Sequence, residues 1–225
     1  MPDTSTPVAT LRVLTPDDLD AATATLTRGF AQEPGNQTLY PDPNIRRRVS
    51  ELIIGKELRA ALPYASVHGI SIGDRLVAAA IWHPPHVEAR SLRANVRTGR
   101  DLLVQAPVLA RGLPRLASVT LHHVRGGIRL TRARREAIAA AGRGASWHLA
   151  FLATDPDHRG RGLARRLLDH VLGRCDADGL PAWLETTDPV NPPLYERFGF
   201  ETVTHLEDAA WLPGYWAMRR EPQQG

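Results

Sequence analysis

Residues 154–168, TDPDHRGRGLARRLL, place two glycines and two arginines directly before an amphipathic helical pattern. Glycine is a poor helix former, so helix propensity does not account for Gly160 and Gly162 at this place. The first N–H groups of a helix have no partner within it, and together with the helix dipole they form an anion site. The glycines would let an anion approach the main chain, and Arg159 and Arg161 would add positive charge. The stretch therefore predicts a phosphate-binding loop, with a glycine turn that only packs helix against strand as the alternative.

The glycine pattern does not match the common nucleotide-binding fingerprints. GRGLAR carries Arg165 where the dinucleotide fingerprint needs its third glycine, and no Walker A pattern occurs in the chain. The phosphate expected at this loop therefore belongs to a ligand that neither of these two fingerprints recognises.

A second motif, WLETTDPVNPPLYERFGF from Trp183, predicts a short helix after a strand. Asn191 suits the N-cap, Pro192 the first helical position and Gly199 the residue just beyond the end. Tyr195 then lies one turn into the helix, where its phenol can reach the end of the sheet that also holds the glycine loop. A phenol, with a pKa near 10, stays protonated at neutral pH and can donate a proton to a leaving group. A tyrosine that only packs the helix is the alternative.

The elements that must position these residues alternate between strands and helices. Apolar runs predict strands, and a 3.6-residue period with capping residues predicts helices. Gly73-Asp74 suits a hairpin turn, residues 36–44 a loop and residues 221–225 a loose tail. The mixed order indicates one α/β domain over residues 1–225. Strands are expected at 8–14, 66–72, 76–84, 147–154, 181–187, 201–206 and 211–218, and helices at 15–35, 44–61, 161–175 and 191–200.

Residues 84–146 form an arginine-rich segment between two strands. The segment holds twelve arginines against Glu88, Asp101 and Glu136, a formal charge of +9, in a chain of 225 residues with a net charge of +4. Its helical spacing, broken by prolines and glycines, predicts a helical insert. Such a charge suits a phosphate-bearing partner or a solvated face. The segment has no Phe, Trp or Tyr to stack on bases, which disfavours nucleic acid as a partner.

The composition is that of a globular protein, with 43% hydrophobic and 23% charged residues. No apolar run reaches transmembrane length, and MPDTSTPVAT does not have the pattern of a signal peptide. Cys175 is the single cysteine, so we expect no disulfide framework, a reducing, cytoplasmic location and a buried rather than catalytic thiol. The pairs His83/His86 and His122/His123 have poor spacing for one metal ion, so no metal site is expected.

The run Arg159-Gly160-Arg161-Gly162-Leu163-Ala164 matches R/Q-x-x-G-x-G/A, the signature of the GNAT superfamily of acyl-CoA-dependent N-acetyltransferases. PAWLETTDPVNPPLYERFGF resembles the end of the fold in the puromycin N-acetyltransferase-like branch. The clear match covers roughly residues 147–205, about a quarter of the chain. The resemblance implies a mixed, mostly antiparallel sheet flanked by helices, whose central strands, 147–154 and 182–187, splay apart to admit acetyl-CoA. The insert at 84–146 is longer and more basic than a minimal GNAT domain needs.

The resemblance also implies roles for single residues, with acetyl-CoA as a cosubstrate. Asn191 would contact the cofactor arm, and Tyr195 would protonate the leaving thiolate. Backbone groups of the splayed strand would pair with the pantetheine arm like an added strand, and N–H groups of the loop would take the pyrophosphate. The strand residues are Phe151, Leu152, Ala153 and Thr154, and the loop residues are Arg159, Gly160, Arg161, Gly162, Leu163 and Ala164.

Transfer of an acetyl group to an amine also needs a base and a donor to the oxyanion. The ammonium must lose a proton before it attacks, and a backbone N–H near Leu152 would hold the oxyanion. For the residue that acts on the amine we choose Glu185, in the strand beside the gap. It would act either as a base through a water molecule or as a charge that orients the amine. His148, in the other strand, is the second candidate. A surface carboxylate and a half-buried histidine are the alternatives, because alternation cannot fix which residues face the gap until the bulge is located.

Three functions stay open. The first is a small-molecule amine N-acetyltransferase, which could inactivate an antibiotic, working as a monomer or homodimer without a membrane partner. The second is a protein or peptide acetyltransferase. The third is a non-catalytic module, either a CoA sensor or a nucleic-acid binder using the insert. The placement of Tyr195 favours an enzyme, and the aromatic residues Tyr40, Trp82, Trp147 and Trp183 favour a small, partly apolar amine.

Overall fold

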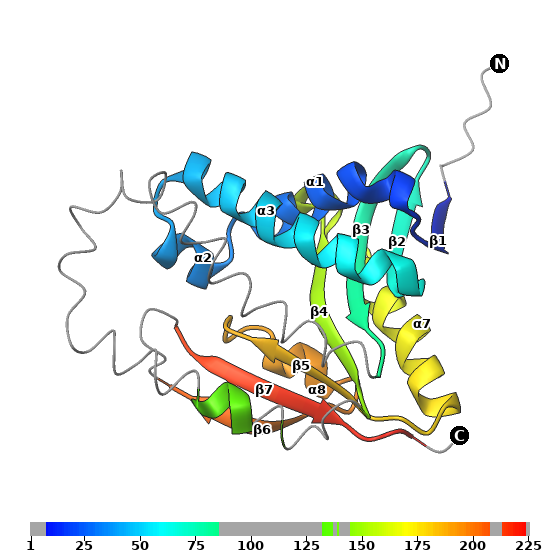
Figure 1. Cartoon of the computed structure of the whole chain (residues 1–225), viewed down its shortest axis with the longest axis vertical. Coiled ribbons are helices and arrows are strands. Elements are labelled where there is room, and N and C mark those ends of the chain that lie inside the picture. Colours follow the sequence, from blue (N-terminus) through cyan, green and yellow to red (C-terminus); the bar gives the residue numbers. More distant parts are fainter. Residues whose placement is uncertain (1–7, 86–131, 137–138, 140–144, 208–212, 224–225) are drawn as a thin grey trace.

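The computed structural model describes residues 8–85, 132–136, 139, 145–207 and 213–223 (Figure 1). The strands are β1 (Ala9–Val13), β2 (Val67–Ile72), β3 (Arg75–His83), β4 (Trp147–Thr154), β5 (Ala182–Thr186), β6 (Glu201–Leu206) and β7 (Tyr215–Arg220). The helices are α1 (Leu19–Gly29), α2 (Pro34–Leu39), α3 (Pro43–Ala61), α7 (Leu163–Ala177) and α8 (Pro192–Glu196), with 3-10 turns at Pro16–Asp18, Leu62–Tyr64 and Pro156–His158.

The strands form one sheet in the order β1-β2-β3-β4-β5-β7-β6. Neighbouring strands are antiparallel except β4 and β5, which are parallel. β4 and β5 pair only from Trp147 opposite Ala182 to Leu149 opposite Leu184. Beyond these residues the two strands diverge, as Figure 1 shows for light-green β4 and orange β5. The predicted splay of the central strands is confirmed.

β4 carries an extra residue where it pairs with β3. Ile81 is opposite Phe151 and Trp82 is opposite Leu149, so Ala150 has no residue opposite it. Ala150 and Phe151 therefore both pack on the side of α1 and α3, whereas Leu149 packs on the side of α7. This bulge fixes the side-chain directions along β4 that alternation alone left open.

Two apolar cores cover the two faces of the sheet. Leu26 of α1 and Ile54 of α3 are fully buried against one face, and Leu167 and Leu168 of α7 against the other. Each such side chain contributes about 1.5–3 kcal/mol by leaving water. Cys175 lies in the α7 core, where burial raises the pKa of its thiol to about 12. The expectation of a buried Cys175 is confirmed.

The end of α1 lies directly against β4. A Cβ placed on Gly29 would collide with the Cβ of Ala153, so only glycine allows this close approach. Phe30 then packs edge-to-face on Phe151, with ring centroids 5.4 Å apart. α1 therefore braces the part of β4 that has left β5.

Three local expectations were wrong. The segment expected as a loop from residue 36 begins inside α2, because the Glu33 carboxylate accepts a hydrogen bond from the Asn36 amide over 2.6 Å and caps the helix that Pro34 begins. The first helix, expected to run from Thr15 to Pro34-Gly35, starts as expected with Thr15 as its N-cap but already ends at Gly29. The tail is anchored at residue 223, where the Gln223 amide donates to Asp176 over 2.7 Å.

Most of the expected insert, residues 84–146, lies outside the described residues. Residues 132–136 form a helical turn, drawn in green beside β6 and β7 in Figure 1. Ala133 of this turn packs with Tyr215 and Ala217 of β7. No helix in the described part of the chain is long and apolar enough to cross a membrane.

Candidate active site

The glycine loop joins the end of β4 to α7. Gly160 and Gly162 have φ angles of +75° and +70°, which side-chain-bearing residues rarely adopt, and, their immediate neighbours aside, no described residue has an atom within 4 Å of where a Cβ would stand. The first bond of the helix runs from the Arg166 amide to the Gly162 carbonyl, at 3.1 Å, so the amides of residues 163–165 lie ahead of the helical ladder. The open space and these N–H groups suit a phosphate group.

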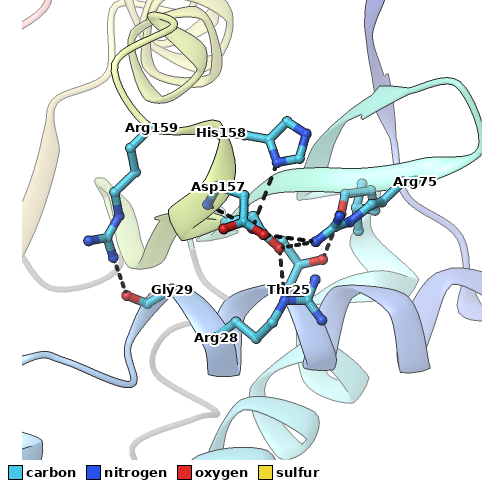
Figure 2. A network of polar contacts seen from close by, with 9 residues as sticks. Thr25, Arg28, Gly29, Arg75, Asp157, His158 and Arg159 are labelled. Carbon is cyan, nitrogen blue, oxygen red and sulfur yellow. Dashed lines mark hydrogen bonds and ion pairs between the residues drawn. The ribbon is translucent and has the colours of Figure 1, made fainter.

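The two arginines of the loop have different surroundings. Arg159 donates to the Gly29 carbonyl over 2.9 Å, which fastens the loop to the end of α1 (Figure 2). Arg161 is exposed. Arg159 thus already has a structural partner, and the expectation that both arginines add charge for an anion stays a prediction.

A buried carboxylate fixes the start of the loop. Asp155 is 1% exposed, and its Oδ2 accepts hydrogen bonds from Arg28 at 2.8 Å and from Arg75 at 3.0 Å. Its Oδ1 accepts from the Asp157 amide at 3.1 Å. Burial opposes ionisation, but the hydrogen bonds from Arg28, the Asp157 amide and Arg75 outweigh it and lower the pKa of Asp155. Sequence reasoning missed this network, because Arg28 and Arg75 are far away along the chain.

One edge of β4 is paired and the other is open along residues 151–154. Phe151, Leu152, Ala153 and Thr154 pair with Ile81, Ala80, Ala79 and Ala78 of β3. On the other side, the pairing with β5 ends at Leu149. Backbone groups on that edge are thus in the arrangement that an added strand requires.

Tyr195 lies in α8 and is 8% exposed within the α7 core. Its ring packs edge-to-face on Phe200, with centroids 5.9 Å apart. Burial raises the pKa of the Tyr195 phenol to about 12, so the phenol remains protonated at neutral pH. Asn191 is at the expected N-cap position, but its side chain does not cap the helix: its Nδ2 donates to Thr186 Oγ1 at 2.9 Å and ties α8 to β5.

Glu185 is the first residue of β5 beyond those that pair with β4, and its carboxylate is held by several donors. Arg134, from the turn at residues 132–136, donates its Nε hydrogen to the two carboxylate oxygens at 2.9 and 3.1 Å. The Tyr215 hydroxyl donates to Oε1 at 2.6 Å, and burial with the neighbouring Glu185 charge raises the pKa of that phenol. His148 Nε2 lies 4.0 Å from Oε2.

His83, His148 and Trp183 form a row across β3, β4 and β5, where each residue is the register partner of the next. His148 stacks on Trp183 with centroids 4.1 Å apart and on His83 with centroids 5.9 Å apart. Burial, and then electrostatic interactions with the His83 ring and the Arg134 guanidinium, lower the pKa of His148 well below its usual value, so its imidazole is neutral at pH 7. Glu57 of α3 contacts His83 Nε2 at 3.0 Å.

The predicted site residues fall on two faces of the sheet. Tyr195 packs on the α7 face, whereas Glu185 and His148 lie on the face of α1 and α3 together with His83. The structure brings Glu185 and His148 together on one face of the sheet and keeps Tyr195 on the opposite face. Within the described residues, no cluster of three or more His, Cys, Asp or Glu side chains could hold a metal ion.

Comparisons with known proteins agree with this arrangement. Residues 118–200 match the model of the acetyltransferase (GNAT) family. Over 94% of this chain and 98% of the other, the structure superposes on the Drosophila melanogaster polyamine N-acetyltransferase with a TM-score of 0.63 and 16% identity. This chain has the GNAT fold. The predicted mixed sheet and the acyl-CoA N-acyltransferase fold are thereby confirmed, while the branch is not specifically supported.

Other GNAT proteins are similar over parts or all of the chain. An uncharacterized N-acetyltransferase of Schizosaccharomyces pombe is 38% identical over 81 residues, 35% of this chain and 32% of that protein. YhbS of Escherichia coli K12, also an uncharacterized N-acetyltransferase, is 39% identical over 66 residues, 29% of this chain and 38% of its own length. The chain thus aligns with about a third of each curated relative. An agmatine N-acetyltransferase structure has a TM-score of 0.63 at 14% identity, covering 95% of this chain and all of the other.

Proposed function

We propose that this protein is an acetyl-CoA-dependent N-acetyltransferase that moves the acetyl group directly from the thioester to the primary amine of a small molecule. The observation that carries the proposal is the course of β4. The strand leaves β5 after Leu149, keeps an open edge over residues 150–154 and runs into a glycine loop with open space beside its main chain. A pantetheine arm needs such an edge and a pyrophosphate needs such a loop.

The cosubstrate is held mainly by backbone groups. Those of Phe151, Leu152, Ala153 and Thr154 pair with the pantetheine arm, and N–H groups of Arg159, Gly160, Arg161, Gly162, Leu163 and Ala164 bind the pyrophosphate. Asn191 reaches the arm from the end of β5, where its amide is held by Thr186. The side chains of this half of the site therefore orient the backbone more than they touch the ligand.

The transfer is a sequence of proton and bond changes. The ammonium of the acceptor loses a proton, and its nitrogen attacks the thioester carbonyl carbon. The carbonyl oxygen takes the negative charge and accepts a hydrogen bond from a backbone N–H near Leu152. The C–S bond then breaks, Tyr195 gives its proton to the departing sulfur, and the nitrogen loses its second proton to leave an amide. One proton is released overall, and Tyr195 is reprotonated from solvent.

Glu185 orients the amine in this scheme. Its oxygens already accept hydrogen bonds from Arg134 and Tyr215, which hold the carboxylate in place beside the opening between β4 and β5. An ammonium approaching on the face of α1 and α3 meets this charge before it meets the thioester. Acceptor and cosubstrate thus approach from opposite faces of the sheet.

The acceptor is proposed to be a small amine, with an antibiotic of the aminonucleoside type as one candidate from the resemblance to the puromycin-like branch. Similar structures include a polyamine and an agmatine N-acetyltransferase, which are enzymes named for small amines. A free, buried Cys175 suits work in a reducing compartment such as the cytoplasm. A protein acceptor is the second candidate, since a structure described as a histone acetyltransferase, from Corynebacterium glutamicum, has a TM-score of 0.58.

A thiol-release assay tests the proposal. Purified protein is incubated with acetyl-CoA and a library of aminonucleosides, aminoglycosides, polyamines, arylalkylamines and peptides, and free CoA is measured with a thiol reagent. We expect release that depends on one class of small amine, with the N-acetyl product identified by mass spectrometry. Release only with peptides would favour the second candidate. Acetyl-CoA binding without transfer to any member would leave a non-catalytic CoA-binding module.

A further inference from the structure

His83 is a buried histidine whose two ring nitrogens have unequal surroundings. The residue is 1% exposed at the end of β3. Its Nε2 lies 3.0 Å from Glu57 Oε2, while its Nδ1 is buried and has no hydrogen-bond partner within the described part of the chain. A buried polar atom without a partner costs about 1–3 kcal/mol, so Nδ1 has room for a donor that is not among the described residues.

The contact with Glu57 decides which nitrogen carries the proton. An ionised carboxylate only accepts hydrogen bonds, so Nε2 must donate to Glu57. A neutral imidazole has one N–H group, which leaves Nδ1 with a free lone pair. Glu57 therefore fixes both the tautomer and the direction of the basic nitrogen, as a carboxylate does for the histidine of a hydrolytic triad.

His83 also lies in the row of residues at which the sheet opens. It is the register partner of His148, which pairs in turn with Trp183, and pairing of β4 with β5 ends one residue later. Glu57 comes from α3, so His83 faces the same side as Glu185. Tyr195, which would protonate the departing sulfur, belongs to the core on the α7 side. In the proposed transfer the acceptor therefore approaches over the face that carries His83.

We propose that His83, oriented by Glu57, takes the proton from the acceptor amine, directly or through one water molecule. The inference rests on the proposed acetyl transfer and assigns the proton acceptor within it. The N–H bond of the ammonium breaks, its electron pair stays on nitrogen, and the proton forms a new bond to His83 Nδ1. The imidazolium so formed is stabilised by the Glu57 carboxylate.

The charged groups around His83 support this assignment. Glu57 from α3 is the direct partner, neutral His148 from β4 covers the ring, and beyond it Glu185 from β5 is held by Arg134. Donors already bind the Glu185 oxygens, so we assign Glu185 the role of orienting the ammonium and not of accepting its proton. The free lone pair of His83 is suited to receive that proton. Glu57 is a positioning residue in this arrangement.

The test compares His83→Gln and Glu57→Gln with wild type on an acceptor from the screen. His205→Gln, at an exposed histidine of β6, and Glu51→Gln, at a half-exposed glutamate of α3, are the matched controls. At pH 7 we expect kcat/KM to fall by about 10² for His83→Gln, which is the range of a lost general base, and by about tenfold for Glu57→Gln. Acetyl-CoA affinity and thermal unfolding should match wild type, and the controls should be unchanged.

The pH profile separates proton transfer from a structural role. The loss in His83→Gln should shrink about tenfold or more as pH approaches the pKa of the amine, and it should be small for a hydrazine-type acceptor that is already neutral at pH 7. A loss that is the same at every pH and for both acceptors would overturn the inference. So would an ¹⁵N spectrum of the wild-type protein that shows the His83 proton on Nδ1. This ¹⁵N measurement of the His83 tautomer does not depend on activity. In Glu57→Gln the His83 ring should lose its strong preference for the proton on Nε2.

Outcomes for the two proposals are distinguishable. If wild type acetylates an amine but His83→Gln keeps the wild-type rate and profile, the assignment of His83 falls and the proposed function stands. If wild type acetylates no amine in the screen, the proposed function falls, and the assignment of His83 falls with it. If His83→Gln does not fold, the rate and pH profile of Glu57→Gln decide whether the assignment of His83 stands, because Glu57 is the partly exposed partner in the same contact.

Discussion

Arg28 donates its Nε hydrogen to Oδ2 of Asp155 over 2.8 Å, although the two residues stand 127 positions apart in the sequence. Arg75 donates to the same oxygen at 3.0 Å. One buried carboxylate thus holds α1, β3 and the end of β4 together, directly before the glycine loop. The position of the loop depends on this ion pair.

Replacing Asp155 by Asn should lower both stability and acetyl-CoA affinity. We expect the free energy of unfolding at pH 7 to fall by about 2 kcal/mol, less than for a fully buried pair, because both arginines are about half exposed. The pKa of Asp155 is lowered in the folded protein, so its contribution is present at neutral pH and is lost as pH falls below about 4. Urea titrations at several pH values measure this, and the gap to wild type should close in acid. Asp157→Asn, at an exposed neighbour, should change stability by less than about 0.5 kcal/mol.

A charge placed at the glycine loop should block the cosubstrate. Gly162→Asp and Gly162→Asn both put a side chain on a residue with a φ of +70°, which Asp and Asn tolerate better than other residues. The aspartate adds a carboxylate beside the expected pyrophosphate, so calorimetry should show no acetyl-CoA binding for Gly162→Asp and weakened binding for Gly162→Asn. Gly173→Asp, in the exposed middle of α7, controls for the added charge. Equal affinity of the Asp and Asn variants at position 162 would argue against a phosphate site.

Removing the Tyr195 hydroxyl should slow the chemical step. Tyr195→Phe keeps the ring in the α7 core, so fold and acetyl-CoA affinity should be little changed. We expect kcat to fall by about 10² or more, because the interaction grows only as the sulfur gains charge. The rate must be measured with an acceptor for which chemistry limits turnover, and Tyr64→Phe, at a half-exposed tyrosine, is the control. Wild-type turnover in Tyr195→Phe would reduce Tyr195 to a packing residue.

His68 should make the protein sensitive to mild acid. It lies on β2 against His170 of α7, with ring centroids 4.9 Å apart. Burial, followed by the charges of His170 and Arg174, lowers its pKa to about 4, so the folded state holds it neutral. The unfolded state binds its proton near pH 6.5, so stability is complete above that pH and falls as pH drops toward 4, by up to about 3 kcal/mol. Thermal melts of His68→Gln should show a shallower loss between pH 6.5 and 4 than wild type, whereas His205→Gln should follow wild type.

The sequence allowed the glycine loop, α7 and the short helix with Tyr195 to be located, because each rests on signals a few residues apart. Gly160 and Gly162 stand immediately before the apolar stripe of α7, and Pro192 marks the start of α8. Hairpin and strand positions followed for the same reason. The bulge at Ala150 could not be located, since it appears only when the register with β3 is known.

Contacts between distant segments account for what was missed. The partner of His83 is on α3, and Arg134, which holds Glu185, comes from a segment whose sequence showed only a surplus of arginine. Asn191 was placed correctly, but its preference for Thr186 over the helix end depends on where β5 stops. Such choices are made by tertiary geometry, which local propensity does not contain.

The sheet divides the site into two surfaces that change separately. In the proposed function, the cosubstrate side depends on backbone groups of β4 and the loop, which most substitutions leave in place. Residues that would meet the acceptor, including Glu185 and His83, project from the other face, and one of their partners, Arg134, belongs to the basic segment. Variation in that segment would then alter which amines are accepted without changing the proposed binding of acetyl-CoA. A chain built this way could change its acceptor while the transfer step stays the same.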